Sequence, residues 1–158
     1  MIKLDLSVPV DSPVRKQFNL IYQFLERNEL NQQLSKVEGV MVIKPESAAY
    51  DDCFAYVFDI ARSSPELNCA IDELVCPLNT SKPQEKGCVW YSGGLGGIEV
   101  KHIGIVQKDG KIVSKWGDNG PIVRHPLWAI PECYGNIARF SRMPNREEIL
   151  RLKRKFVQ

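Results

Sequence analysis

Apolar residues recur at helical spacing along one stretch near the N-terminus. After Ser12 and Pro13, which suit a helix start, apolar side chains return every three or four positions over residues 14–28. The stripe consists of Val14, Phe18, Ile21 and Leu25, and it is widened by Leu20, Tyr22 and Phe24. This pattern predicts an amphipathic helix that packs on the protein core. Residues 2–8 alternate apolar and polar instead, which favours a short strand, and Pro9 confines that strand to a sheet edge.

A second helix is predicted over residues 51–61. Asp51 suits its N-cap, and the apolar residues on one helical face are Phe54, Val57, Phe58 and Ala61. Cys53 then lies in the first turn, where free backbone N–H groups and the helix dipole favour a thiolate. Asp51 and Asp52 act against this, because nearby negative charge disfavours a thiolate. Activation of Cys53 would therefore depend on a basic partner elsewhere in the chain.

Stretches rich in β-branched and aromatic residues follow this helix and predict an antiparallel sheet. Residues 100–106 and 111–117 flank Asp109 and Gly110, and an Asp-Gly pair between two such stretches is a strong hairpin signal. His102 lies at the start of the first stretch. Further strand candidates are residues 40–43, 88–91 and 136–141.

The register of the predicted hairpin has two solutions. A two-residue turn at Asp109 and Gly110 places Lys115 and Gly117 on the face of His102. A bulge at Gly110 after a three-residue loop places Ser114 and Trp116 there instead. The choice decides which side chains of the second strand can reach the histidine.

Two more helices complete the pattern. One covers residues 67–75, and the other begins at the capping-box pattern of Asn145 and Glu148. The glycine-rich residues 92–97 are followed by β-branched residues rather than by a helix, so we expect a connector between strands and not a phosphate-binding loop. Because this connector leads to His102, it could also act as a mobile flap over a site there.

Composition and charge narrow the function classes. A chain of 158 residues with 44% hydrophobic and 25% charged residues is expected to form a single soluble α+β domain over residues 1–158. The net charge of +2 gives no reason to expect a nucleic-acid partner. No apolar stretch approaches the roughly 18 residues that cross a membrane, and residues 1–6 lack the core of a signal peptide. We therefore expect a cytoplasmic protein without membrane contact.

The cysteines and histidines indicate neither a disulfide framework nor a zinc site. Five cysteines form an odd set without tight pairs, although Cys69 and Cys76 could bridge in an oxidising compartment. The two histidines and the cysteines do not have zinc-ligand spacing. We expect reduced thiols and no metal or organic cofactor.

The order of cysteine and histidine suggests acyl-transfer chemistry. A helix-borne cysteine followed by an antiparallel sheet that carries a histidine is the arrangement of thiol hydrolases. His102 would take the thiol proton of Cys53 and return it to the leaving group, while a third polar residue holds the ring. Candidates for that third residue are Asp118, Ser114 and His125. Trp116 and Trp128 are candidates for substrate contact beside the site, and Tyr134 could line an apolar pocket there with Trp128, although packing under a loop is the alternative.

Residues 45–135 resemble the NlpC-type and CHAP-related cysteine peptidases and amidases, which have a reduced papain-like fold. The cysteine motif Asp-Cys-Ser-Gly-aromatic-Val of these proteins is similar to residues 52–57, and their His-aliphatic-Gly-aliphatic motif is similar to residues 102–105. The resemblance implies N-terminal helices, a nucleophile at a helix start and a small antiparallel sheet. It also implies an orienting residue near Ser114, which favours the bulged hairpin, and a peptide or peptidoglycan-like substrate.

The sequence departs from these families in two places. Phe54 stands where they have serine, and no Tyr-x-x-Gly-Gly stretch precedes Cys53. We therefore carry two hypotheses. The first is a cysteine peptidase, amidase or acyl-transferase that acts on an amide bond through Cys53 and His102, with the Cys53 backbone N–H in the oxyanion hole. The alternative is a non-enzymatic interaction module on the same fold that binds an unknown protein partner.

Overall fold

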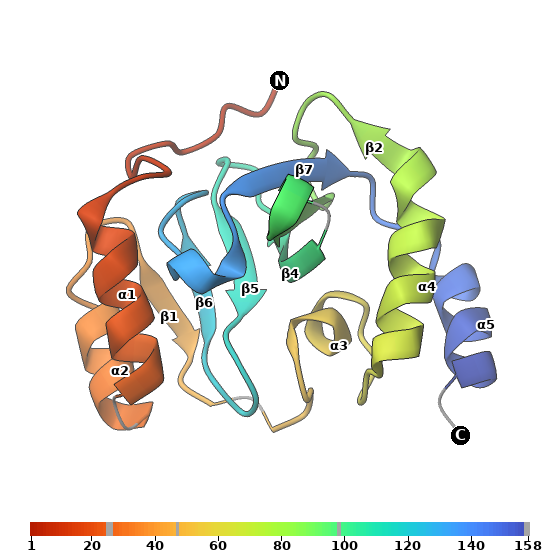
Figure 1. The fold of residues 1–158 in the computed structure, drawn as a ribbon, viewed down its shortest axis with the longest axis horizontal. Coiled ribbons are helices and arrows are strands. Elements are labelled where there is room, and N and C mark those ends of the chain that lie inside the picture. Colours follow the sequence, from red (N-terminus) through yellow and green to blue (C-terminus); the bar gives the residue numbers. More distant parts are fainter. Residues whose placement is uncertain (25–26, 47, 98, 157–158) are drawn as a thin grey trace.

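The computed structural model describes the chain except for residues 25, 26, 47, 98, 157 and 158 (Figure 1). The α-helices are α1 (Pro13–Phe24), α2 (Arg27–Leu34), α3 (Cys53–Val57), α4 (Pro65–Val75) and α5 (Arg146–Phe156). The strands are β1 (Met41–Lys44), β2 (Asn79–Thr80), β3 (Cys88–Gly93), β4 (Glu99–Val106), β5 (Ile112–Lys115), β6 (Ile122–His125) and β7 (Ile137–Ser141). Three short 3₁₀ turns are η1 (Cys76–Leu78), η2 (Leu95–Gly97) and η3 (Glu132–Tyr134).

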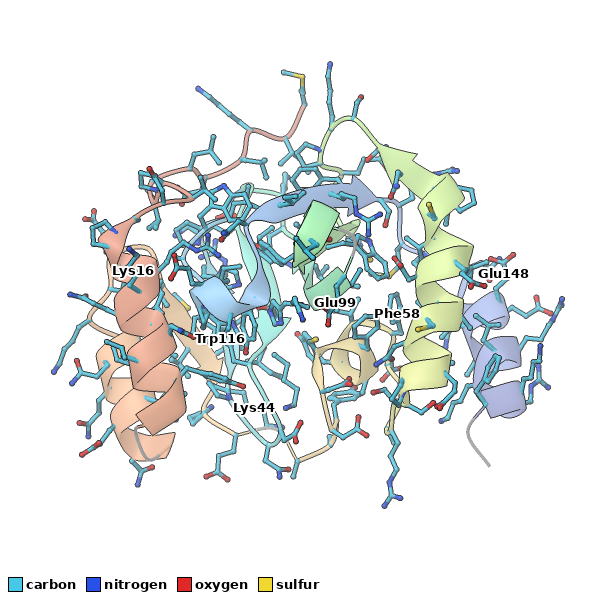
Figure 2. All side chains as sticks on the ribbon, in the orientation of Figure 1. Lys16, Lys44, Phe58, Glu99, Trp116 and Glu148 are labelled. Atoms are coloured by element: carbon cyan, nitrogen blue, oxygen red, sulfur yellow. The ribbon has the colours of Figure 1, made fainter. Side chains whose placement is uncertain are left out.

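The strands form one antiparallel sheet with helices on both sides. The strand order is β1-β6-β5-β4-β3-β7-β2. Figure 1 shows α1 and α2 at one side and α3, α4 and α5 at the other. Each side has its own apolar core: the α1-side core includes Phe18 and Trp116, and the α4-side core includes Phe58 and Trp90 (Figure 2). The expected α+β class is confirmed.

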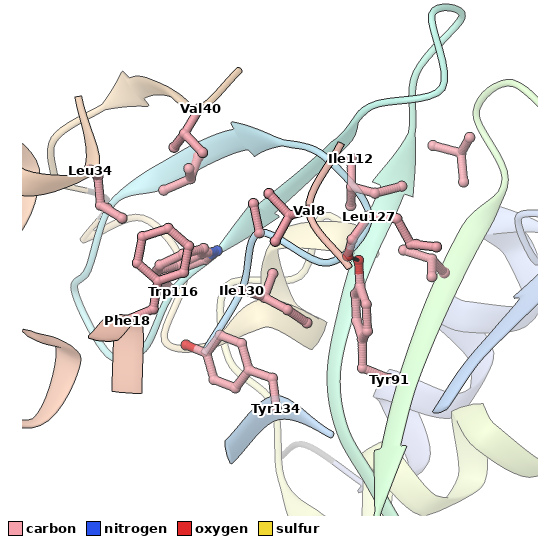
Figure 3. Packing of buried hydrophobic residues seen from close by; sticks show 14 of the residues in the cluster. Val8, Phe18, Leu34, Val40, Tyr91, Ile112, Trp116, Leu127, Ile130 and Tyr134 are labelled. Atoms are coloured by element: carbon pink, nitrogen blue, oxygen red, sulfur yellow. Dashed lines mark hydrogen bonds between the residues drawn. The ribbon is translucent and has the colours of Figure 1, made fainter. Parts of the chain in front are cut away.

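Helix α1 begins at Pro13, as the sequence predicts, and packs its stripe on the α1-side core. The ring of Phe18 meets Trp116 edge to face with 5.9 Å between centroids, and Figure 3 shows both beside Tyr134. Leu20 is exposed, so the expected widening of the stripe is wrong at that position. The predicted contributions of Phe24 and Leu25 lie outside the described side chains. The predicted helix extends to residue 28; residues 25 and 26 lie outside the described residues, and residues 27 and 28 belong to α2.

The hairpin of β4 and β5 has the bulged register. Ile105 pairs with Val113 and Val106 with Ile112, and the N–H of Gln107 donates to the carbonyl of Lys111 at 2.8 Å. Gly110 has a φ of +80°, a conformation that glycine adopts without strain. By alternation along both strands, Ser114 and Trp116 share the His102 face, and Lys115 lies on the opposite face with α3.

Helix α3 is shorter than predicted and starts one residue later. Its N-cap is Asp52, whose carboxylate accepts from the N–H of Ala55 at 2.8 Å. Asp51, the predicted cap, accepts instead from the N–H of Ser63 at 3.1 Å. The helix ends at Val57 because Asp59 adopts a φ of +53° and turns the chain, so that Ile60 rather than Ala61 is buried.

The remaining predictions have mixed outcomes. Residues 1–8 form no strand, because they bond to the rest of the protein only at isolated points such as the Leu127 N–H to the Asp5 carbonyl, 3.1 Å. The strands β1, β3 and β7, the helix α5 and a helix at residues 67–75 are confirmed; the last is α4, which starts two residues earlier at Pro65. Among the described helices, none has the length and apolar character needed to cross a membrane.

Candidate functional site

Cys53 and His102 line the same cavity, which has a volume of about 300 Å³. Cys53 is the first residue of α3, and His102 lies in the middle of β4. The described lining residues are Tyr22, Asp52, Cys53, Phe54, Asn68, Val100, Lys101, His102, Gly117 and Tyr134. The structure thus brings together the two residues that the sequence analysis placed at the centre of the chemistry.

The cavity forms where β4 and β5 separate. Within the described part of the chain, the two strands pair only at their hairpin end, as far as Ile105 and Val113. Helix α3 packs against both strands, and the backbone N–H of Ile103 acts on the Cys53 sulfur. Cys53 and His102 lie on opposite sides of the sheet, but both line the cavity because β4 and β5 separate there.

Burial keeps the Cys53 thiol neutral. It raises the pKa of the thiol to about 12, and the Asp52 carboxylate acts in the same direction. The backbone N–H groups of Ile103, Cys53 and Phe54 lower the pKa but do not outweigh burial. The expectation that the helix start alone favours a thiolate is therefore wrong, because α3 is short and its first turn is desolvated.

His102 is held by aromatic rings. Its side chain is only 1% exposed, and its ring stacks on Tyr134 with 3.9 Å between centroids and 6° between planes. Tyr91 lies 5.8 Å away on the neighbouring strand. Burial, with a contribution from the nearby His125, holds the pKa of His102 well below 6.5, so the resting ring is neutral. Its Nε2 atom has no hydrogen-bond partner among the described residues.

Ser114 and His125, two candidates for the third residue, bind each other. Nδ1 of His125 lies 2.7 Å from the carbonyl of Pro126, which can only accept, so Nδ1 carries the proton. Nε2 of His125 therefore accepts from the Ser114 hydroxyl at 2.9 Å, and that hydroxyl in turn accepts from Nε1 of Trp116 at 3.1 Å. Ser114 lies on the His102 face as predicted, but its proton is used by His125.

Asp118 and the two tryptophans also lie away from the cavity lining. Asp118 is exposed after β5. Trp116 is fully buried in the α1-side core, and Trp128 lies under the guanidinium of Arg15, 5.1 Å from its ring centroid. The structure does not bring these predicted site residues into the cavity, because the α1-side core takes up the tryptophan rings.

Tyr22 is a site residue that sequence reasoning did not select, and Tyr134 is one that it considered only for an apolar pocket beside the site. Tyr22 comes from α1, and its hydroxyl packs on Gly117, where an added Cβ would lie 1.9 Å from it. Tyr134 is buried in η3, and its hydroxyl interacts with the hydroxyl of Tyr22. The signal for Tyr22 was its helical stripe and that for Tyr134 its place between Pro131 and Gly135, but neither pattern indicates what the ring contacts.

Arg15 fixes the segment that carries Tyr134. It is fully buried in α1, and its guanidinium donates to the carbonyls of Ile130 at 3.2 Å and Gly135 at 2.6 Å. It also donates to Oδ1 of Asn136 at 3.0 Å. These charge-assisted bonds hold both ends of residues 130–136, and with them the ring that stacks on His102.

The glycine-rich connector lies outside the cavity lining. Residues 92–97 run from the end of β3 through η2, and β4 follows them, so the predicted connector between strands is confirmed. None of its described residues lines the Cys53 cavity, and residue 98 lies outside the described residues. A flap over the site stays a prediction.

Comparison with known proteins identifies no relative. No protein-family model matches the chain, and no curated protein and no solved structure matches it significantly. The described residues also contain no group of three or more His, Cys, Asp or Glu side chains that could hold a metal ion.

Proposed function

We propose that the protein is a thiol hydrolase or acyl-transferase that acts on an amide bond, with Cys53 as nucleophile and His102 as general base and then acid. One observation carries this proposal: a cysteine at a helix start and a histidine on the adjacent sheet line one cavity. That arrangement supports a papain-like domain, and the motif resemblance at residues 52–57 and 102–105 supports the same assignment.

The reaction starts from a neutral pair. His102 takes the proton of the Cys53 thiol as the sulfur attacks the amide carbonyl. The backbone N–H groups of Cys53 and Phe54, which already act on the sulfur, stabilise the oxyanion of the tetrahedral intermediate. His102 then protonates the leaving amine, and the thioester is passed to water or to a second nucleophile. A neutral base suits the step, because an imidazolium cannot accept the proton.

Stacking replaces a hydrogen-bonded third residue in this proposal. The parallel ring of Tyr134 fixes the plane of His102, and Arg15 fixes the segment that holds Tyr134. The rings of Tyr22, Phe54 and Tyr134 give the cavity an aromatic character, while Asn68 and Lys101 add polar groups. A peptide with an apolar residue at the cleaved bond fits such a cavity, in line with the peptide or peptidoglycan-like substrate that the resemblance implies.

The second candidate is a non-enzymatic interaction module. Three observations favour it: the high thiol pKa of Cys53, the lack of a hydrogen-bond partner for Nε2 of His102 among the described residues, and Phe54 at a position where the families have serine. In that case the cavity would bind a partner side chain without bond cleavage.

A turnover assay separates the two candidates. We expect the parent protein to release amine from members of a peptide-amide library, and Cys53→Ala and His102→Ala to abolish the release. Cys133→Ser is the matched control, because Cys133 is an exposed thiol beside Tyr134 and is outside the cavity lining. Equal release by the parent and by Cys53→Ala would reject the enzyme, and binding of a peptide without turnover would support the module.

A further inference from the structure

Lys115 is a buried lysine beside the Cys53 cavity. It is the last residue of β5, it is 0% exposed, and its ammonium group donates to the carbonyl of Gly117. No ion pair joins it to a carboxylate among the described residues. A buried ammonium without a charged partner is costly, and burial accordingly lowers the pKa of Lys115 below its ordinary 10.5.

Lys115 lies on the face of the sheet that carries Cys53, and His102 lies on the other face. The hairpin register places Lys115 on the face of the sheet that carries α3, and α3 packs against β5 as well as β4. Gly117, which accepts the ammonium hydrogen bond, lines the cavity. The charge of Asp118, and after it those of Asp52, a Cys53 thiolate and Asp51, act to keep Lys115 protonated.

We propose that Lys115 is an electrostatic positioning residue of the site, whose buried positive charge stabilises the Cys53 thiolate. This inference rests on the proposed function and names a residue that the Cys–His arrangement does not include. The thiol proton leaves for His102, so that one negative charge forms on the sulfur, on the same face of the sheet as Lys115. Lys115 neither gains nor loses a proton in this step.

The surrounding charges explain why such a cation is needed. Asp52 caps α3 next to the sulfur and opposes a thiolate, while the helix is too short for its dipole to compensate. The ionisable groups around the sulfur and the ammonium come from every neighbouring element: Tyr22, Asp51, Asp52, Lys101, His102, Asp118 and Tyr134. Lys101 is exposed and paired with Glu99, so the buried cation on the α3 face is Lys115.

The test is the pH dependence of Cys53 alkylation by iodoacetamide, with the modified thiol assigned by mass spectrometry. Below the thiol pKa, the alkylation rate rises tenfold per pH unit, and a higher pKa lowers the rate at every pH. We expect Lys115→Met and Lys115→Gln to slow Cys53 about tenfold between pH 7 and 9, the loss of a nearby unit charge being about one pKa unit. Lys115→Arg keeps the charge, so the alkylation rate of its Cys53 should lie within about threefold of the parent rate.

The pH profile contains a second signature. In the parent protein, the Cys53 thiolate loses its stabilisation when Lys115 loses its proton. The plot of the logarithm of the alkylation rate against pH should therefore become less steep where Lys115 titrates, at a pH under the ordinary lysine value of 10.5. The two neutral variants should lack this break. Lys115→Gln can still donate to the Gly117 carbonyl, so it keeps the local structure if Lys115→Met does not fold, as judged by circular dichroism.

The outcomes separate this inference from the proposed function. If His102→Ala slows Cys53 but the folded neutral variants alkylate at the parent rate, the inference fails and the proposed function stands. A different outcome overturns both the inference and the proposed function. In that outcome, Cys53 of the parent protein has an alkylation rate, relative to its thiolate fraction, no higher than that of the exposed Cys133, and His102→Ala leaves the Cys53 rate unchanged. A tenfold loss in the neutral variants, with recovery in Lys115→Arg, establishes the charge effect.

Discussion

Both histidines of the chain are buried as neutral rings, which predicts a protein that loses stability in mild acid. Burial lowers the pKa of His125 from 6.5 to about 4 and holds that of His102 well below 6.5. The unfolded chain takes up protons on both rings near pH 6.5, whereas the folded protein does not. The contribution to stability is therefore complete above pH 6.5 and is lost as the pH falls toward 4.

The magnitude follows from His125. With a pKa of 6.5 in the unfolded chain and about 4 in the folded protein, proton uptake lowers the free energy of unfolding by about 2 kcal/mol at pH 5. His102 adds a loss of the same sign. Most carboxylates titrate below this range, so the change between pH 7 and pH 5 reports mainly on the two histidines.

Urea denaturation at pH 7, 6 and 5 measures this change. The matched variant is His125→Asn, whose amide can still donate to the Pro126 carbonyl but does not titrate. Its free energy of unfolding should fall by about 2 kcal/mol less than that of the parent between pH 7 and 5. Equal stability of the parent at pH 7 and 5, or an unchanged pH dependence in His125→Asn, would refute the assignment of a buried neutral ring.

Three substitutions test the packing around the site. Arg15→Met removes the buried guanidinium from its carbonyl acceptors and should lower the free energy of unfolding, measured in urea, by about 3–5 kcal/mol. The control Lys16→Met, at an exposed position, should change it by less than about 0.5 kcal/mol, and a similar effect of both would contradict a structural role of the Arg15 hydrogen bonds. Gly117 has a φ of +67°, and in Gly117→Ala the added Cβ would lie 1.9 Å from the Tyr22 hydroxyl, so the melting temperature should fall. Gly93→Ala is the control, because its Cβ meets nothing closer than 3.5 Å. Tyr134→Leu keeps a buried apolar side chain but removes the aromatic ring that stacks on His102. Turnover should fall about tenfold or more, with kcat affected more than KM. An unchanged kcat would show that stacking does not position the His102 ring.

Local patterns predicted the elements that depend on neighbouring residues. The Asp109-Gly110 turn and its flanking β-branched stretches define the hairpin, and Gly110 adopts the positive φ that a bulged turn requires. The α1 stripe and the Asn145 cap likewise act within one or two turns of the chain. These features were correctly placed because their causes lie within a few residues.

Features that depend on distant contacts were missed. Arg15 binds carbonyls more than a hundred residues away, and its position in an amphipathic helix gives no sign of this. The pairing of Ser114 with His125 depends on the β5–β6 register, which no local pattern specifies. The burial that raises the pKa of Cys53 was not foreseen, because a helix start is visible in the sequence and its desolvation by packing is not.

The central claim is that Cys53 becomes acylated with the help of His102. The most direct measurement is the intact mass of the protein after incubation with an activated acyl donor such as a peptide thioester, followed by peptide mapping of the adduct. The account predicts one acyl group on Cys53 in the parent protein, its release by hydroxylamine, and its loss in His102→Ala. Acylation spread over the exposed Cys69, Cys76 and Cys133 with Cys53 unmodified, or an equal adduct in His102→Ala, would contradict it.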